Sequence, residues 1–307
     1  MKKQLLTAIC LLFSIFTLTA QNDKFWNAFK NDVSKIEINK GVKRVTFPKE
    51  FNLYTLDLNL LKQELFTIVN GSAKKSIIIS LPNANGEMEL FEMYEASNFV
   101  PELQAQFPEI RAFSGKGITD KSSLLKLSIS PQGISTTVFR ANRENEFIEP
   151  YSQDNVIYAV YSSKRDKAKL PWTCTTEDQE FLEKTSSQFD ASVTSRLSDA
   201  TLRTMRLAQS CTAEYSNYFG ATSSAQVGLV MAAFNATMTR CNGVYEKDLG
   251  LHLNLIANTT SVIYYNPTTD PYSDAAQMGN WNGELQATLT SVIGEANYDI
   301  GHLFGAT

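Results

Sequence analysis

The first half of the chain carries β-branched and extended hydrophobic runs separated by turn residues, a pattern typical of β-strands. Predicted strands and one hairpin, the latter with a Pro-Gln-Gly turn, lie at Ser76–Pro82, Asn83–Ala96, Ser123–Phe139 and Asn155–Ser163. Two other segments have helical spacing, Leu53–Ile68 and Val100–Pro108. Residues from about 22 to 170 are therefore expected to form a mainly β domain.

From Leu202 onward the hydrophobic period alternates between that of strands and that of helices. Predicted strands lie at 202–211, at 251–258 with a continuation through 261–266, and at 297–306; predicted helices lie at 220–250 and 284–294. Gly250 supplies the stop of the longer helix. The order β-α-β-α-β predicts a mostly parallel sheet with helices packed on it.

A polar segment separates the two patterned blocks. Residues 175–202 are rich in Ser, Thr and Asp, with few hydrophobic positions. Such a stretch is typical of an exposed linker, where a protease cuts most easily. The expected organisation is a β-rich domain over residues 21–174, a linker or processing region over 175–199, and a second domain over 200–307.

The N-terminus has the three parts of a secretory signal peptide. Lys2 and Lys3 precede an apolar run of about 14 residues, Leu5–Leu18, and Ala20 offers a small residue for cleavage. A membrane-spanning helix needs roughly 20 apolar residues. Residues 1–20 are therefore predicted to be removed, and the mature chain is expected to begin near Gln21 and to be secreted or displayed at the cell surface.

An odd number of cysteines remains once Cys10, interpreted as a hydrophobic residue of the signal peptide, is set aside. These are Cys174, Cys211 and Cys241. In an exported protein one of three thiols lacks a partner within the chain. The pairing is left open at this stage, and the odd count is one indication that the chain is incomplete.

The composition and net charge of the chain bear on its domain count and on the partners it could bind. The chain of 307 residues is 43% hydrophobic and 20% charged, with a net charge of −4 at pH 7. It is long enough for two domains with separate cores. An acidic balance gives no reason to expect nucleic acid or an anionic membrane as a partner.

Two histidines are the first candidates for chemistry. His252 lies on the polar side of an alternating strand and is expected at a surface or sheet edge. Aligned on the zinc motif HExxHxxGxxH, the C-terminus has Tyr298 for the first His, Asp299 for Glu, His302 for the second His, and Gly305 for Gly. Catalytic zinc normally has three protein ligands. We therefore predict a strand with an incidental histidine.

Two carboxylates in the turn Thr269–Asp274 raise the alternative of a calcium site, against that of a solvated turn. The sequence contains no other metal, nucleotide or nucleophile motif that rises above background.

Four phrases in order resemble the start of the catalytic domain of bacterial reprolysin-like (adamalysin-type) zinc metallopeptidases. They are RTMRLAQSCTAEYSNYFG, MTRCNGVYEKDLGLHLNLIAN, IYYNPTTDPY and VIGEANYDIGHLFGAT, within about residues 200–307. The segment Phe91–Gly117 also resembles the propeptide ahead of such domains. The fold implied is an α+β, β-rich propeptide domain followed by the upper part of an α/β metzincin-type domain with a mostly parallel sheet.

The resemblance implies an exported zinc metalloendopeptidase precursor, acting on proteins or peptides, that is truncated before its zinc motif and is inactive as it stands. It places no catalytic residue and no metal ligand in this chain. Tyr298, Ile300, Gly301 and Leu303 become candidates for an edge strand that binds substrate. Cys174 becomes a candidate zymogen switch, a thiolate that blocks zinc; the alternative is a disulfide or a packed thiol.

A secreted, non-enzymatic binding or surface protein with a protease-like domain is the alternative function. The sequence leaves the oligomeric state open.

Overall fold

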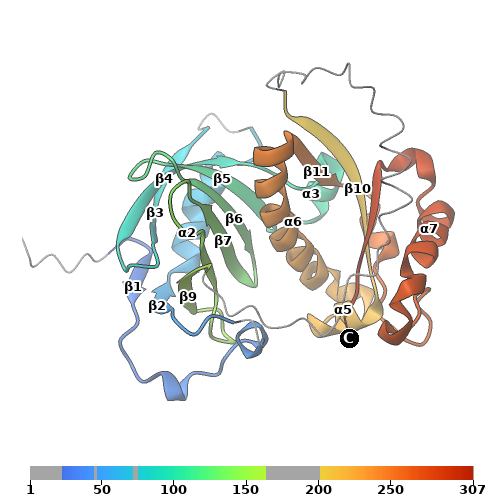
Figure 1. Ribbon diagram of the computed structural model, residues 1–307, viewed down its shortest axis with the longest axis horizontal. Helices are drawn as coiled ribbons and strands as arrows, with labels where there is room; N and C mark the ends of the chain where they lie inside the picture. Colours follow the sequence, from blue (N-terminus) through green and yellow to red (C-terminus); the bar gives the residue numbers. More distant parts are fainter. Residues whose placement is uncertain (1–22, 45–46, 72–74, 164–200, 307) are drawn as a thin grey trace, which may run out of the picture.

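Two sheets of different construction make up the computed structural model, which describes residues 23–44, 47–71, 75–163 and 201–306 (Figure 1). Residues 23–163, here called the β-rich region, form a nine-stranded antiparallel sheet, and residues 201–306, the C-terminal region, form a three-stranded parallel sheet. The predicted contrast between a β-rich first part and a mostly parallel second part is confirmed. The predicted signal peptide, residues 1–20, and the predicted linker, residues 175–199, lie outside the described residues.

The nine strands follow the order β1-β2-β9-β8-β7-β6-β5-β4-β3. Their bounds are β1 (Trp26–Ala28), β2 (Asn52–Leu56), β3 (Ile77–Pro82), β4 (Met88–Glu95), β5 (Arg111–Gly117), β6 (Leu124–Ser130), β7 (Gly133–Phe139), β8 (Glu146–Pro150) and β9 (Ile157–Ser162). The predicted hairpin is β6–β7, and Gly133, with φ of +106°, supplies the left-handed position of its turn.

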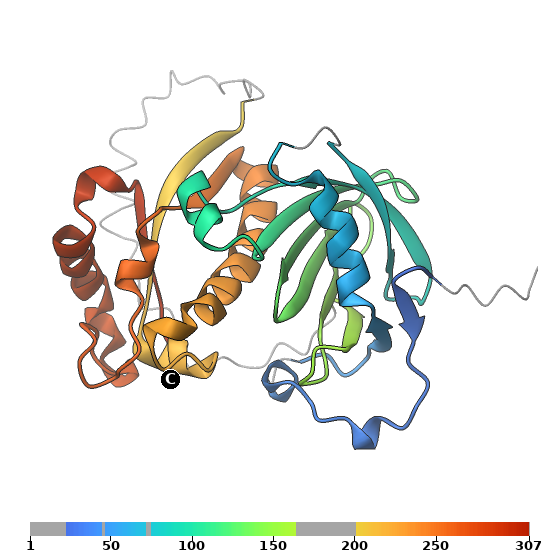
Figure 2. The same ribbon diagram turned by 180° about the vertical axis from the view of Figure 1, so that it is seen from behind.

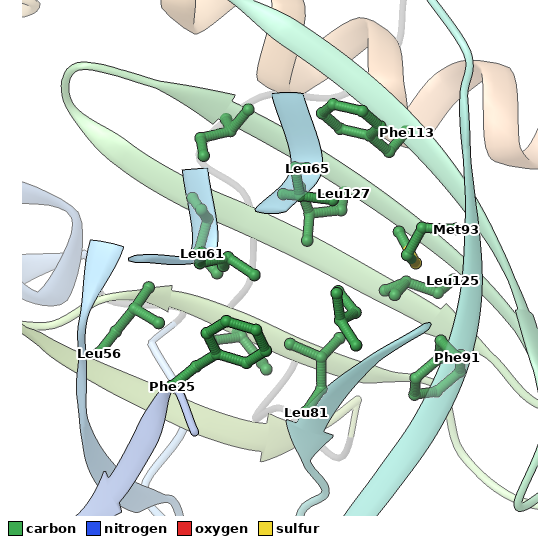
Figure 3. Close-up of a cluster of buried hydrophobic side chains, with 14 of the residues drawn as sticks. Phe25, Leu56, Leu61, Leu65, Leu81, Phe91, Met93, Phe113, Leu125 and Leu127 are labelled. Carbon is green, nitrogen blue, oxygen red and sulfur yellow. The ribbon is translucent and has the colours of Figure 1, made fainter. Parts of the chain in front are cut away.

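The main core of the β-rich region lies between the sheet and helix α2 (Leu58–Leu65). Figure 3 shows Leu65 of this helix beside Leu127 of β6, and Leu61 and Leu125 belong to the same cluster. Because side chains alternate along a strand, the other face of β6 carries Lys126 and Ser128. Both polar residues are nonetheless buried, since a helix of the C-terminal region covers that face.

The helix predicted over Leu53–Ile68 is wrong in its first turn. Residues Asn52–Leu56 form β2, which pairs with β1 and β9. Helix α2 starts only after Asp57, whose carboxylate accepts a hydrogen bond from Leu60 N at 2.9 Å. An N-cap of this kind sets where a helix begins. The residues before Asp57 pair with β1 and β9 as a strand instead.

In the C-terminal region the central strand is β10 (Arg203–Cys211), flanked by β11 (Leu251–Leu255) and β12 (Ile300–Phe304). Helices α5 (Ala213–Tyr218) and α6 (Val227–Leu249) connect β10 to β11, and α7 (Trp281–Val292) precedes β12. The α6 and α7 helices lie on opposite faces of this sheet (Figures 1 and 2). Gly250 ends α6 at φ +61°, as predicted.

The remaining helical segments are short. They are α3 (Pro101–Gln106) and the 3-10 turns η2 (Val33–Lys35), η3 (Lys40–Lys43), η4 (Phe66–Ile68), η5 (Ser224–Gln226), η6 (Thr259–Val262), η7 (Ala275–Asn280) and η8 (Glu295–Asn297). The strand continuation expected at 261–266 is wrong, because η6 occupies its start and Ile263 makes only a single bridge to Cys211.

A segment of the β-rich region extends the parallel sheet. Val100 N donates to Leu255 O at 3.1 Å, and Leu255 N donates to Asn98 O at 2.8 Å, so residues 98–100 lie beside β11. Phe99, Leu103 and Ile110 then pack in the same core as α6. The two regions therefore share one hydrophobic core in addition to their own.

Buried amides fasten this segment to α6. The Nδ2 group of Asn98 donates to Asn235 Oδ1 and to Thr239 Oγ1, both at 2.8 Å, and its Oδ1 accepts from Asn242 Nδ2 at 2.9 Å. Asn235 in turn donates to Arg111 O at 2.9 Å. Because these buried polar groups satisfy one another, the contact has a fixed register along the helix.

Ion pairs cross the same interface. Lys126 of β6 pairs with Glu246 of α6. Glu149 of β8 accepts from Arg240 of α6 at 2.5 Å and from Arg44 at 3.0 Å. Burial opposes the ionisation of Glu149, but the charges of Arg240 and Arg44 and a hydrogen bond from Tyr161 outweigh it and lower the pKa to about 2.

The close approach of α6 to the large sheet depends on Gly243. A Cβ there would lie 2.5 Å from Phe139 Cε2 and 2.9 Å from Lys126 Cγ. We expect Gly243→Ala to lower the free energy of unfolding by about 1–3 kcal/mol, because overpacking outweighs the better helix propensity of alanine. Urea unfolding measures this, with Gly228→Ala as the control. Gly228 lies in the same helix with nothing within 4 Å of its added Cβ, and alanine there should stabilise by up to ~1 kcal/mol. Equal effects at both positions would contradict the packing.

Glu149 should make folding stability depend on pH in the acid range. Its folded pKa of about 2 lies below the ordinary 4.5, so its contribution is present above pH 4.5 and is lost as pH falls toward 2. A difference of this size corresponds to roughly 3 kcal/mol. Urea unfolding at pH 5 and pH 3 should show a smaller pH effect in Glu149→Gln than in the wild type. The exposed Glu50→Gln should keep the wild-type pH effect; the same reduction in both variants would contradict the assignment.

Candidate functional site around strand β12

Strand β12 confirms the strand predicted near the C-terminus. It pairs in parallel with β10, in the register Leu207↔Ile300 to Cys211↔Phe304. Within the part of the chain that the structure describes, no strand pairs with its other edge. The backbone of β12 is therefore the end of the small sheet on that side.

Both faces of β12 are covered by helices. Ile300 and Phe304 pack in the core shared with α6, and Phe304 stacks on Tyr215 with ring centroids 5.3 Å apart. Tyr298 and Leu303 pack on the opposite side with α7. The candidate substrate contacts Tyr298, Ile300 and Leu303 thus direct their side chains into the protein, which leaves the backbone edge as the accessible feature.

Gly301 allows α7 to lie close to β12. A Cβ at this position would overlap Leu289 Cδ1 of α7, which is itself buried. The glycine of the candidate edge strand is thus explained by packing beneath the strand.

Asp299, the counterpart of the zinc-motif Glu in the sequence alignment, forms a two-pronged pair with Arg206. Arg206 Nη2 donates to Oδ1 at 2.7 Å, and the backbone N of Arg206 donates to Oδ2 at 2.7 Å. These hydrogen bonds lower the pKa of the carboxyl group to about 2. Through its hydrogen bonds to Arg206, Asp299 ties the start of β12 to β10.

His302 remains at the surface of β12, with its ring edge-on to Phe304 at a centroid distance of 5.0 Å. Loss of water on that side lowers the pKa of its imidazole. In the described residues no group of three or more His, Cys, Asp or Glu side chains is placed to hold a metal ion. These residues do not fit a catalytic zinc, which normally takes three protein ligands.

His252 corrects a prediction. It was expected at a surface or edge, but it is only 8% exposed. Its Nδ1 lies 2.7 Å from Glu246 Oε1, and its Nε2 lies 3.1 Å from the carbonyl oxygen of Ser97. His252 is buried because Glu246 of α6 and Ser97 of the β-rich region lie against its ring.

The two cysteines in the described residues differ in burial. Cys211 is fully buried and Cys241 partly so, and both are free. Burial raises the pKa of the Cys211 thiol to about 11, so the group is protonated at neutral pH. Cys174, the candidate zymogen switch, lies outside the described residues.

The acidic turn serves as an anchor. Asp270 Oδ2 accepts from Ala213 N at the start of α5, 2.8 Å away, and its Oδ1 accepts from Tyr272 N at 3.3 Å. Asp274 is exposed. The described residues contain no group of three or more His, Cys, Asp or Glu side chains that could bind calcium at this turn.

Sequence reasoning missed the polar side of α6. Asn235, Thr239, Asn242 and Glu246 recur every three or four residues, and all four bond across to other elements. That spacing is readable in the sequence, but a polar stripe is also what a solvated helix face has.

No helix of the described residues has both the length and the hydrophobicity needed to cross a membrane. A comparison with protein families matches residues 201–307 to the reprolysin-like metallopeptidases of family M12B. This match covers about a third of the chain and includes both sheet crossovers. A comparison with curated proteins finds no match.

Proposed function

We propose that the protein is the precursor of an exported zinc metalloendopeptidase, because residues 201–307 match the reprolysin-like metallopeptidases of family M12B. The supporting observation is the parallel sheet β11-β10-β12 with a helix on each face, lying within the matched residues. Its substrates are proteins or peptides. The β-rich region is the propeptide, and residues 1–20 are the signal that exports it.

Zinc is the metal of this family in general. We place its ligands and the general base in the sequence that follows Thr307 in the intact protein, in an HExxHxxGxxH motif. His302 and Asp299 have no part in the chemistry. The 307-residue chain alone is expected to cleave no peptide.

The first experiment reads the coding sequence past the codon for Thr307. The proposal expects the zinc motif within roughly 100 residues. The extended protein should cleave a denatured protein substrate, lose that activity with a zinc chelator, and regain it with Zn²⁺. N-terminal sequencing of exported protein should start near Gln21.

His302→Asn in the extended protein tests the assignment of the metal site. We expect kcat/KM to change by less than about twofold, whereas loss of a true zinc ligand abolishes activity. Mass spectrometry of the native protein gives the zinc content as a second readout. A loss of both zinc and activity in His302→Asn would contradict the assignment of His302 as a residue outside the zinc site. A stop codon directly after Thr307 would replace the protease proposal with the binding-protein alternative.

The open edge of β12 is proposed to pair with an extended peptide, through backbone groups of the segment from Tyr298 to Leu303. Main-chain hydrogen bonding of this kind tolerates varied side chains. Hydrogen–deuterium exchange at residues 300–304 should slow when an extended peptide is added, while exchange in β3, at the edge of the large sheet, stays unchanged. Equal protection of both edge strands, or none in β12, would contradict the proposal.

A further inference from the structure

A cavity of about 710 Å³ lies where the β-rich region meets helices α5 and α6. Its walls come from η3 with the residues around it, from β6, β7 and β8, and from α6 between Leu229 and Cys241. Figures 1 and 2 show the blue segment around residues 40–43 close to α5. Lys40 bridges the two sides there, since its Nζ donates to Tyr218 O at 3.3 Å. The volume falls within the range of small-molecule sites, which often lie between domains.

The part of the lining that comes from α6 is apolar up to Ala236 and consists mainly of alanines. Leu229 and Ala233, and likewise Ala232 and Ala236, stand four residues apart on one face of α6. The lining also includes the larger apolar side chains Ile38, Phe47, Ile134 and Phe219. Alanine leaves space where a longer residue would fill it, so the helix docks while the cavity stays open.

The charged residues of the lining are mostly positive. They are Lys40, Lys43, Arg44, Arg240 and a single acid, Glu149. Glu149 is held ionised by both guanidinium groups and by Tyr161, so it neutralises one of the four positive charges. An excess of positive charge thus gathers in one cavity of a chain whose net charge is −4.

Two polar atoms of the lining lack a partner. Arg240 Nε and Gln132 Oε1 are both buried, and neither has a hydrogen-bond partner among the described residues. A buried unsatisfied group costs free energy unless a ligand satisfies it. Arg240 Nε is a donor, which calls for an acceptor such as a carboxylate or phosphate oxygen.

We propose that this cavity binds an organic anion: a ligand with one carboxylate or phosphate group and an apolar body. The anionic group pairs with the lysines of η3 and with Arg240, and the body packs on the alanine face of α6. Both regions supply walls, so the ligand stabilises the docked arrangement of the β-rich region on α6. This site is separate from β12 and stands whether or not the protein is a protease.

Isothermal titration calorimetry on the full chain tests the proposal with four probes: 2-naphthylacetate, 2-naphthyl phosphate, uncharged 2-naphthylethanol and inorganic phosphate. Either naphthyl anion, or both, should bind in a 1:1 ratio, at least tenfold more tightly than the alcohol and than inorganic phosphate. The tighter of the two anions identifies the headgroup. A saturating anion should also raise the Tm of the chain.

Two variants locate the site. The double variant Lys40→Gln, Lys43→Gln should weaken anion binding about fivefold to tenfold, and Lys35→Gln, an exposed lysine of the same region outside the cavity, should leave it unchanged. Ala236→Phe should abolish binding by filling the cavity. If Ala236→Phe fails to fold, the comparison of anion binding between the double lysine variant and Lys35→Gln still tests the location of the site.

Binding of the alcohol or of inorganic phosphate as tightly as the anions would overturn the proposal, as would the absence of saturable anion binding. Full binding in Ala236→Phe, or equal weakening in the double variant and in Lys35→Gln, would place the ligand elsewhere and overturn it as well.

Discussion

The arrangement of the two regions depends on the hydrogen bonds that the buried residue Asn98 makes. Its backbone extends the parallel sheet beside β11, and its amide bonds three polar side chains of α6 at the same time. All four residues are buried, so each amide that loses its partner would be left unsatisfied in the interior. The register of the segment on β11 and the register of α6 on the large sheet are consequently set together.

The interface around this contact is more polar than a typical core. Lys126, Glu246 and His252 lie in it, as do Glu149 and Arg240. Buried ion pairs often add little net stability compared with apolar packing, because desolvation offsets the attraction. Their effect here is to specify one docking geometry, in which Lys126 and Glu149 of the β-rich region meet Glu246 and Arg240 of α6. An interface built of polar contacts also suits two parts that separate later, as the proposed propeptide must.

Strand β12 shows how one segment takes part in structure and in proposed function through different atoms. Its side chains pack against α6 on one face and α7 on the other, and Asp299 holds its start against β10. The resemblance of its histidine and aspartate to a zinc motif therefore comes from residues whose roles lie in packing and pairing. In the proposed function the backbone edge of β12 binds the substrate, and the cavity beside η3 is proposed as a second site with different chemistry.

The sequence by itself determined the alternation of strands and helices after Leu202, the end of α6 at Gly250 and the β6–β7 hairpin. These features follow from hydrophobic period and turn residues, which act over a few positions of the chain. The resemblance to reprolysin-like metallopeptidases was likewise read from local phrases, and the family comparison matches the same residues, 201–307.

Only the tertiary structure decided which polar residues are buried. His252 and Lys126 occupy positions that alternate with apolar neighbours, as on a solvated strand face, yet α6 and the segment at 98–100 cover them. It also decided that residues 53–56 belong to a strand and that residues 261–266 form none, apart from a single bridge at Ile263. The physical reason is that the partners lie many residues away, and no local period records a contact between segments distant in the chain.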